Sequence, residues 1–333
     1  MTIFLDTNVI PFKSGLSIAF ETLVILANEA NQDVVITDVV LNESLAHRKR
    51  EIEEAFSSLR SAFRKARIYA DNITEIELPN VQDLIDKWKT DLLRRVKVVE
   101  TPISAFEEAI FREIQRIRPT REGKGARDAV IWIGIKYAHL ASNTTNYFVS
   151  QNTKDFGSSL QDDDFHEDLK KEIDNFSFPL IYCKSIDKLL ERIAPRIQEG
   201  ITVTSQLLEN SDETQRAIRR YLQENLLLRN FFDLPSGKEY ISSVITFSDY
   251  KIRKPSTYLV ENRYVVVIEI SCLTYFNVGI LQQSSGGGFS TLQYPANLSL
   301  NIRLWMIFEA NHDLPDRVEV SYMYVKSSSN KSI

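Results

Sequence analysis

Short apolar runs alternate with amphipathic segments over the first 196 residues of the chain. Ile3–Leu5 and Val34–Ile36 are continuously apolar, which is typical of strands buried on both faces of a parallel sheet. Tyr147–Ser150 and Leu180–Tyr182 are predicted as further strands. Because strands that alternate with helices build βαβ units, the pattern predicts an α/β fold with a mostly parallel sheet flanked by helices.

The segments between these strands show the spacing of amphipathic helices. One predicted helix begins near Val39 and keeps an apolar stripe as far as Phe63 within a charged sequence. Thr37 or Asp38 would cap its start. Further helices are predicted at residues 17–31, 81–96, 104–117, 129–141 and 186–193.

From Tyr240 onwards, helical spacing gives way to strict alternation of apolar and other residues. Three stretches alternate in this way: Tyr264–Phe276, Leu298–Phe308 and Val318–Tyr324. The pattern predicts an antiparallel β domain over residues 237–326. Residues 197–236 are predicted as a helical linker, and residues 327–333 as a flexible tail. The first domain would then span residues 1–196.

Composition narrows the function classes. At 333 residues the chain is long enough for two domains, and its net charge of −5 argues against a globally basic nucleic-acid binder. Its two cysteines, Cys183 and Cys272, form neither a disulfide framework nor a zinc motif. No secretion signal or membrane-length apolar run is present. We therefore expect a cytoplasmic protein without a membrane partner.

Four acids share one predicted setting. Asp6 and Asp155 follow the carboxyl ends of strands, while Glu43 and Asp128 lie near the amino ends of helices that follow other strands. In a parallel sheet these positions face one rim, where ligands collect. Taken singly, each acid has another explanation as a turn residue or a helix cap. Together they would repel one another, and a divalent cation, Mg²⁺ or Mn²⁺ for oxygen ligands, would relieve that repulsion.

Two basic segments lie beside these acids in the sequence. Arg112–Arg127 is the most basic stretch of the chain, and Arg48–Arg50 follows Glu43. Both would supply phosphate contacts, although such runs more commonly solvate helix faces. The candidate substrate-binding cations are Arg48, Arg121, Lys124 and Arg127.

The four acidic stretches resemble the motifs of the PIN-domain nuclease family. Leu5–Asn8 resembles the first motif and Val39–Glu43 the second, whereas Gly125–Ala129 resembles the third and Val149–Phe156 the fourth. Each motif alone is weak, and their order and spacing make the resemblance strong. It covers roughly residues 1–196.

The resemblance implies a site and an activity. Asp6, Glu43, Asp128 and Asp155 would be the catalytic metal ligands. Three further residues would support them: Asn8, Ser150 and Asn152. Members of the family commonly cleave RNA with Mg²⁺ or Mn²⁺, so the same is implied here. The long helical region between Glu43 and Asp128 departs from the small nucleases of the family, and a helical arch there would restrict entry to single strands or ends.

Three hypotheses follow for the function. The first is a metal-dependent endoribonuclease with RNA as its partner. The second keeps the site but makes the substrate DNA, as a structure-specific or single-stranded DNA nuclease. The third is a non-catalytic PIN-fold binding module in a toxin-antitoxin or defence system. In each, the β domain would recognise substrate, bind a regulatory protein or form a homo-oligomer.

Overall fold

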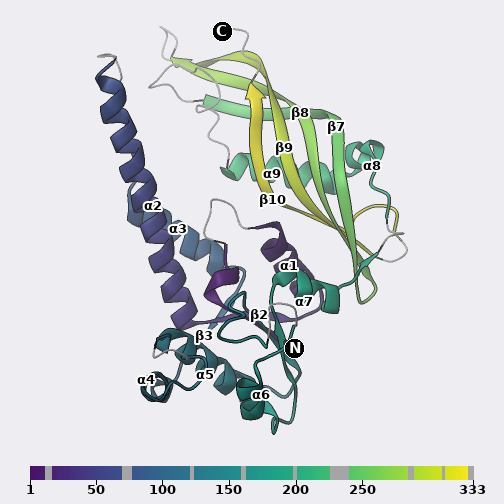
Figure 1. The fold of residues 1–333 in the computed structure, drawn as a ribbon. Helices are drawn as coiled ribbons and strands as arrows, with labels where there is room; N and C mark the ends of the chain where they lie inside the picture. The colour runs from purple at the N-terminus through teal and green to yellow at the C-terminus, as the bar shows by residue number, and fades with distance from the viewer. Residues whose placement is uncertain are drawn as a thin grey trace. The chain divides into compact units, whose positions relative to one another are not determined.

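The computed structural model describes residues 1–11, 17–69, 77–120, 124–158, 163–197, 201–225, 240–283, 289–309 and 312–328. The chain divides into two compact units, Met1–Ile193 and Ala194–Ile333. The first contains a parallel sheet with helices, and the second a separate antiparallel sheet (Figure 1). The predicted fold class is therefore confirmed. Within the described ranges, no helix is both long and apolar enough to cross a bilayer.

The sheet of the first unit has five strands in the order β3-β2-β1-β4-β5, and all neighbours are parallel. The strands are β1 (Thr2–Leu5), β2 (Asp33–Thr37), β3 (Lys97–Val99), β4 (Asn146–Val149) and β5 (Leu180–Cys183). The chain moves outward from β1 to β3 and then returns to place β4 on the other side of β1. The direction of winding therefore reverses between β1 and β4, the place where open α/β sheets form a binding crevice.

Helices cover both faces of this sheet (Figure 1). They are α1 (Ile18–Glu29), α2 (Asp38–Arg67), α3 (Val81–Leu93), α4 (Ile103–Gln115), α5 (Ala126–Leu140), α6 (Glu167–Ile173) and α7 (Ile186–Ile193). The α1 and α7 helices pack together, as do α4 and α5. Hydroxyl caps set two helix starts, because Ser17 Oγ accepts from Phe20 N and Thr37 Oγ1 accepts from Val40 N.

Aromatic packing fixes the loop that leaves β4. Phe148 in β4 lies edge-on to Phe156, with 5.0 Å between ring centroids, and Trp132 of α5 lies edge-on to Phe165 at 5.2 Å. All four rings are buried. Such pairs stabilise by about 0.5–1.5 kcal/mol beyond the area they bury. The residues just before Phe156 are therefore tied to the core at one end.

Only the first half of α2 packs into the unit. Val40, Leu41, Ser44 and Ile52 are its buried residues, and no position after Ile52 is buried. The helix is thus as long as its apolar stripe predicts, although the distal part of that stripe is at most half-buried.

The second sheet is antiparallel, in the order β10-β9-β8-β7-β6. Its strands are β6 (Arg196–Ile197), β7 (Tyr240–Val260), β8 (Arg263–Gln283), β9 (Phe289–Glu309) and β10 (Arg317–Ser328). Alternate residues of β8 and β9, among them Ile268, Ile270, Ile302 and Leu304, form its buried core. The alternation in the sequence therefore marks this face of the sheet.

The segment predicted as a linker over 197–236 differs in the structure. It contains α8 (Ser205–Asn210) and α9 (Asp212–Asn225), whose Leu208, Ile218 and Leu222 lie in the core of the second sheet. Their apolar residues bury a sheet face that would otherwise meet water. These helices are part of the second unit, while residues 226–239 lie outside the described ranges.

The predicted ends of the first domain and of the tail also shift. Arg196 and Ile197 pair with β7 of the second sheet, and the first unit ends at Ile193 rather than at residue 196. At the other end, Ser327 and Ser328 still pair with β9. The rest of the predicted tail, residues 329–333, lies outside the described part of the chain.

Candidate active site

The site begins where β1 and β4 end side by side. Leu5 is in register with Val149, and the next residue on each strand is polar, Asp6 on one and Ser150 on the other. Asp6 N donates to Val149 O at 3.0 Å, so the strand pairing extends to the acid itself. The parallel register therefore places Asp6 and Ser150 together at the switch point.

Asp6 is almost completely buried, and hydrogen bonds hold both of its oxygens. Oδ1 accepts from Thr7 N at 2.7 Å, while Oδ2 accepts from Ser150 Oγ at 2.5 Å and from Asn8 Nδ2 at 2.8 Å. Thr7 begins the short 3-10 helix η1 (Thr7–Val9), which Asp6 caps. The carboxylate is thus fixed in place by the two residues that follow it and by the neighbouring strand.

Ser150 is itself fixed from several sides. Its Oγ accepts from Asn8 Nδ2 at 3.2 Å and from Asn152 N at 3.0 Å, and its carbonyl accepts from the buried Tyr182 hydroxyl at 2.6 Å. Asn8 Oδ1 accepts in turn from Gln151 N at 2.8 Å. This network joins β1, β4 and β5 around one carboxylate.

Glu43 approaches the same rim from the second turn of α2. Its Oε2 accepts from Thr7 Oγ1 at 2.8 Å, and its Oε1 pairs with Arg127 at the start of α5. His47, one turn further along α2, lies 3.6 Å from the same oxygen. The Glu43 carboxylate is therefore linked both to the Asp6 turn and to the helix that carries Asp128.

Asp128 lies in the first turn of α5, which begins at Ala126. The helix is preceded by Gly125 at φ +101°, a backbone conformation that favours glycine. A Cβ at position 125 would lie 3.1 Å from Asp128 Oδ2. Asn152 Nδ2 donates to Asp128 Oδ1 at 3.4 Å. The helix therefore starts in a form that leaves space for this carboxylate.

The four carboxylates act on one another electrostatically. Burial, with a smaller contribution from the charge of Glu43, raises the pKa of Asp6 to about 6 despite the hydrogen bonds that the carboxylate accepts. Burial, followed by the charges of Asp6, Asp155 and Glu43, raises the pKa of Asp128 to about 7. The structure thus brings all four predicted acids into one electrostatic group.

Coordination distance is a stricter condition than electrostatic proximity. In the ranges that the structure describes, no three acidic, histidine or cysteine side chains lie close enough together to hold a metal ion as they stand. The donor set is nevertheless carboxylate oxygen, which suits Mg²⁺ or Mn²⁺, and the raised pKa values show negative charge that a cation would relieve. In donor chemistry and charge, the residues fit a hard divalent ion.

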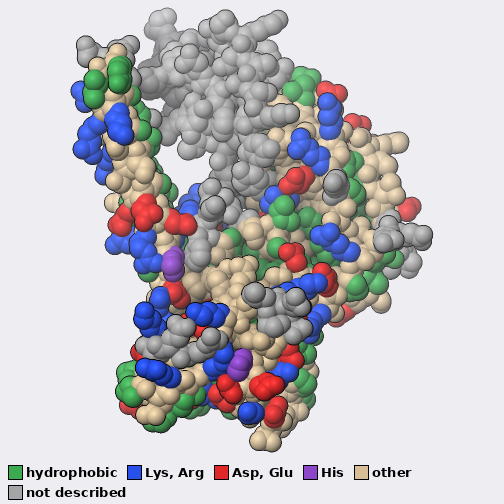
Figure 2. Space-filling model, viewed as in Figure 1, with side chains coloured by type: hydrophobic (Ala, Val, Ile, Leu, Met, Phe, Trp, Pro, Cys, Tyr) green, Lys and Arg blue, Asp and Glu red, His purple; other side chains and the backbone are tan. Residues whose placement is uncertain are grey.

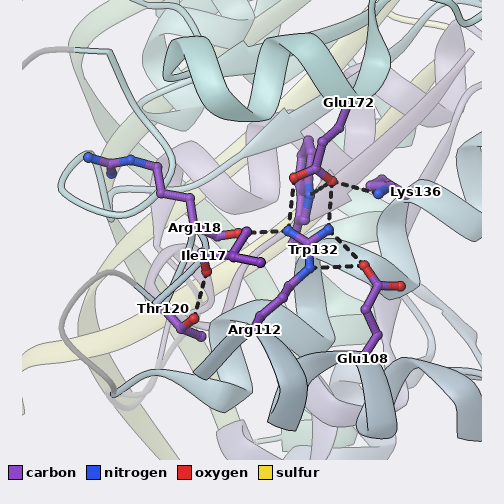
Figure 3. A network of polar contacts seen from close by, with 8 residues as sticks. All are labelled: Glu108, Arg112, Ile117, Arg118, Thr120, Trp132, Lys136 and Glu172. Carbon is purple, nitrogen blue, oxygen red and sulfur yellow. Dashed lines mark hydrogen bonds and ion pairs between the residues drawn. The ribbon is translucent and has the colours of Figure 1, made fainter. Parts of the chain in front are cut away.

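Arg112, at the start of the basic segment, has a different role from the phosphate contact considered for it. It is buried, and its Nη1 and Nη2 each lie 2.8 Å from a Glu172 oxygen, while Nη2 also binds Glu108 at 2.7 Å. Glu172 also accepts from Lys136 and Trp132 (Figure 3). Arg112 therefore joins α4 to α6 and is not available to a substrate.

Arg118 links this network to the fourth acid. Arg112 Nη1 donates to the Arg118 carbonyl at 2.6 Å, and Arg118 Nη1 donates to the carbonyls of Lys154 at 2.8 Å and Asp155 at 3.4 Å. The Arg118 side chain is 10% exposed. With Phe156 packed in the core on the other side, the backbone of Asp155 is held from both directions.

The predicted substrate-binding cations lie in different surroundings. Lys124 is exposed beside the start of α5, and Arg127 is exposed but ion-paired with Glu43. Arg48 is half-buried on α2. Arg121 lies outside the described residues.

Sequence reasoning missed three contributors to the site, Thr7, Arg118 and Tyr182. Thr7 lies within the first motif, and its hydroxyl was the available signal. The other two act through backbone carbonyls far away in sequence, so no local pattern marks them.

Comparison with known proteins gives one family. A family model described as a PIN domain matches residues 3–156, which contain all four acids. This confirms the predicted resemblance for the N-terminal part of the chain, and a PIN-domain match suggests a fold of the nuclease type. No curated protein and no solved structure gives a significant match.

The raised pKa values predict how stability depends on pH. An acid whose pKa is higher in the folded chain than in the unfolded chain stabilises the fold below its ordinary pKa, and that stability is lost as pH rises through about 6 to 7. In EDTA, Asp128→Asn should therefore raise the free energy of unfolding by about 1–3 kcal/mol more at pH 8.5 than at pH 5.

Urea unfolding at both pH values measures this difference. Asp83→Asn, which removes an exposed acid from the first turn of α3, controls for the loss of one negative charge at a helix start. An equal effect of Asp128→Asn at pH 5 and pH 8.5 would contradict the electrostatic account.

The Arg118 contacts predict a local effect on the fourth acid. Arg118→Ala removes the donors to the carbonyls of Lys154 and Asp155, so amide hydrogen exchange should accelerate in the loop 151–157, with an overall destabilisation of about 1–2 kcal/mol. Mass spectrometry of exchange locates the change. Arg94→Ala, at the exposed arginine that follows the last residue of α3, is the control. Unchanged exchange in the loop would show that Arg118 does not position Asp155.

Proposed function

We propose that this protein, whose residues 3–156 match a PIN-domain family model, is a metal-dependent endoribonuclease that hydrolyses phosphodiester bonds of RNA. The observation that carries the proposal is the electrostatic group of Asp6, Glu43, Asp128 and Asp155 at the switch point of the sheet. Four acids from four separate segments concentrate negative charge there, and the pKa values of Asp6 and Asp128 are raised. Structural roles alone give no reason for that arrangement.

The proposed ligands of Mg²⁺ or Mn²⁺ are the four carboxylates. Since no three of them meet at coordination distance as they stand, part of the coordination would come from water, as is usual for Mg²⁺. A bound ion would supply positive charge to the phosphate and favour ionisation of the attacking water. Asp6, fixed by Thr7, Asn8 and Ser150, would provide the rigid ligand.

The remaining residues have defined tasks in this proposal. Burial and the neighbouring acids raise the pKa of Asp128 to about 7, so ion binding near neutral pH would be coupled to release of a proton from this carboxyl group. Asn152 donates to Asp128 and would orient it. Water would attack the phosphorus, the bond to the 3′ oxygen would break, and the products would be a 5′-phosphate and a 3′-hydroxyl.

Substrate contacts near the acids would come from cations around the rim. Lys124 is exposed just before α5, and Arg127 would exchange its pairing with Glu43 for a phosphate. Arg48 and Arg121 are the other proposed contacts. The second unit would recognise RNA, bind a regulatory protein or join two copies of the chain.

A cleavage assay tests the activity directly. The purified protein should degrade RNA with Mg²⁺ or Mn²⁺ and not in EDTA, and Asp6→Asn or Asp128→Asn should lower the rate by about a hundredfold or more, as for ligands of catalytic metals. Asp83→Asn serves as the control. Undiminished cleavage by either site variant would remove the basis of the proposal. Stronger cleavage of single-stranded or flap DNA than of RNA would support the DNA nuclease instead.

Metal binding separates the enzyme from a non-catalytic module. Calorimetry should show that the protein binds Mn²⁺, with an affinity that falls from pH 8 to pH 5 because protons compete for Asp6 and Asp128. Asp6→Asn should abolish most of this binding. Absence of binding to the unaltered protein would favour a PIN-fold scaffold.

A further inference from the structure

The distal half of α2 carries a concentration of positive charge. Between Ala55 and Tyr69 the sequence contains Arg60, Arg64, Lys65 and Arg67 and no acid, although the whole chain has a net charge of −5. In Figure 2, Lys and Arg side chains gather over the end of the long helix that lies away from the sheet. All four are exposed.

Within the described ranges, no acid balances these four charges. Among the described residues, no ion pair or hydrogen bond joins any of the four to an acid, whereas Arg48 on the same helix lies 3.9 Å from Glu51 and Arg112 is bound by two glutamates. Arg60 and Arg64 are spaced i, i+4, and Arg64 and Arg67 are spaced i, i+3. Like charges at these spacings destabilise a helix.

Ordinary structural roles account for only part of this pattern. Cations in the last turn of a helix interact favourably with its dipole, which applies to Arg64, Lys65 and Arg67. Arg60 lies before that turn. Solubility would be served equally well by acids, and none is present over these fifteen residues. These roles do not explain why every charge in the segment is positive, whereas a negatively charged binding partner does.

The four cations lie on the same helix as one of the acids of the rim. Arg60, Arg64 and Arg67 lie on one face of α2, and Glu43 lies on the same helix near its start. At 1.5 Å per residue, the positions from Arg60 to Arg67 lie about 25 to 36 Å from Glu43 along the helix axis. One rigid element therefore carries both a site acid and a remote row of cations.

The rim itself is poorly suited to attract a polyanion. Its four carboxylates repel phosphate, Arg127 is paired with Glu43, and Arg112 is buried. Cations elsewhere on the chain would therefore add to the affinity that Lys124 and Arg127 supply at the rim.

We propose that residues 55–69 are a phosphate-binding arm, which holds a nucleic-acid strand about 25 to 36 Å from the bond that is cut. The inference rests on the proposed function for the cleavage site but concerns a separate surface. Its consequence is a dependence on substrate length. Only a strand long enough to reach from the rim to Arg60 would gain the extra contacts.

The test uses the full chain in EDTA, so that nothing is cleaved. Arg60→Gln, Arg64→Gln and Arg67→Gln are combined in one variant, because glutamine preserves helix propensity. The control combines Lys97→Gln, Lys171→Gln and Lys188→Gln, which removes the same charge from exposed lysines that pair with acids. Circular dichroism and thermal unfolding confirm that both variants fold.

Binding of fluorescent single-stranded RNA is measured against salt concentration, with one strand long enough to span α2 and one too short to reach Arg60. For the long strand, the slope of log K against log salt should fall in magnitude by about 2 in the arm variant, as expected for three lost phosphate contacts. The short strand cannot occupy the rim and the arm at once, so the unaltered protein should bind the long strand more tightly, and this advantage of the long strand should be lost in the arm variant. The control variant should resemble the unaltered protein with both strands.

Each outcome has a distinct meaning. An unchanged slope with the long strand, an equal loss with both strands, an equal loss in the control variant, or no binding by the unaltered protein would overturn the arm. Cleavage of RNA in Mn²⁺ together with an unchanged slope would reject the arm and keep the nuclease. A length-dependent loss of binding in a protein that never cleaves would keep the arm and reject the nuclease.

Discussion

Uncompensated negative charge at the adjoining ends of β1 and β4 is the constraint on which the first unit depends. The sheet order places Asp6 beside Ser150, and the helices that follow other strands add Glu43 and Asp128 to the same rim. The cost of burying these charges appears as raised pKa values at Asp6 and Asp128. The surrounding hydrogen bonds from Thr7, Asn8 and Ser150 do not remove that cost, because they hold the acid in position without neutralising it.

The same unit treats its other acids differently. Glu172 is enclosed by Arg112, Lys136 and Trp132, and its pKa is lowered by those hydrogen bonds although burial opposes them. Breaking a buried pair of this kind typically costs about 3–5 kcal/mol. Neighbouring parts of one fold thus contain a neutralised carboxylate that binds helices together and a group of four carboxylates whose charge Arg127 balances only in part. That contrast separates structural acids from candidate functional ones.

Much of this arrangement could be predicted from the sequence, because period and strand-end position are local properties. Apolar runs locate β1 and β2, and an acid at a strand end must face the rim. The three-residue strand β3 was missed, since Lys97 and Val98 are exposed and carry no apolar run. The sequence predicts a linker where α8 and α9 lie, because an amphipathic pattern does not say which sheet will cover it. Arg112 was grouped with surface cations because its partner Glu172 is sixty residues away.

Substitution of an acid changes both its charge and its position in the site. A substitution at Gly125 would change only the position of Asp128. The positive φ of Gly125 and the 3.1 Å between a built Cβ and Asp128 Oδ2 mean that a methyl group there presses on the carboxylate and strains the turn before α5. The charge would remain while its location moved. Replacing Gly125 by alanine would therefore shift the acidic group without removing any ionisable side chain. Such a variant distinguishes an effect of where Asp128 lies from an effect of whether it is charged.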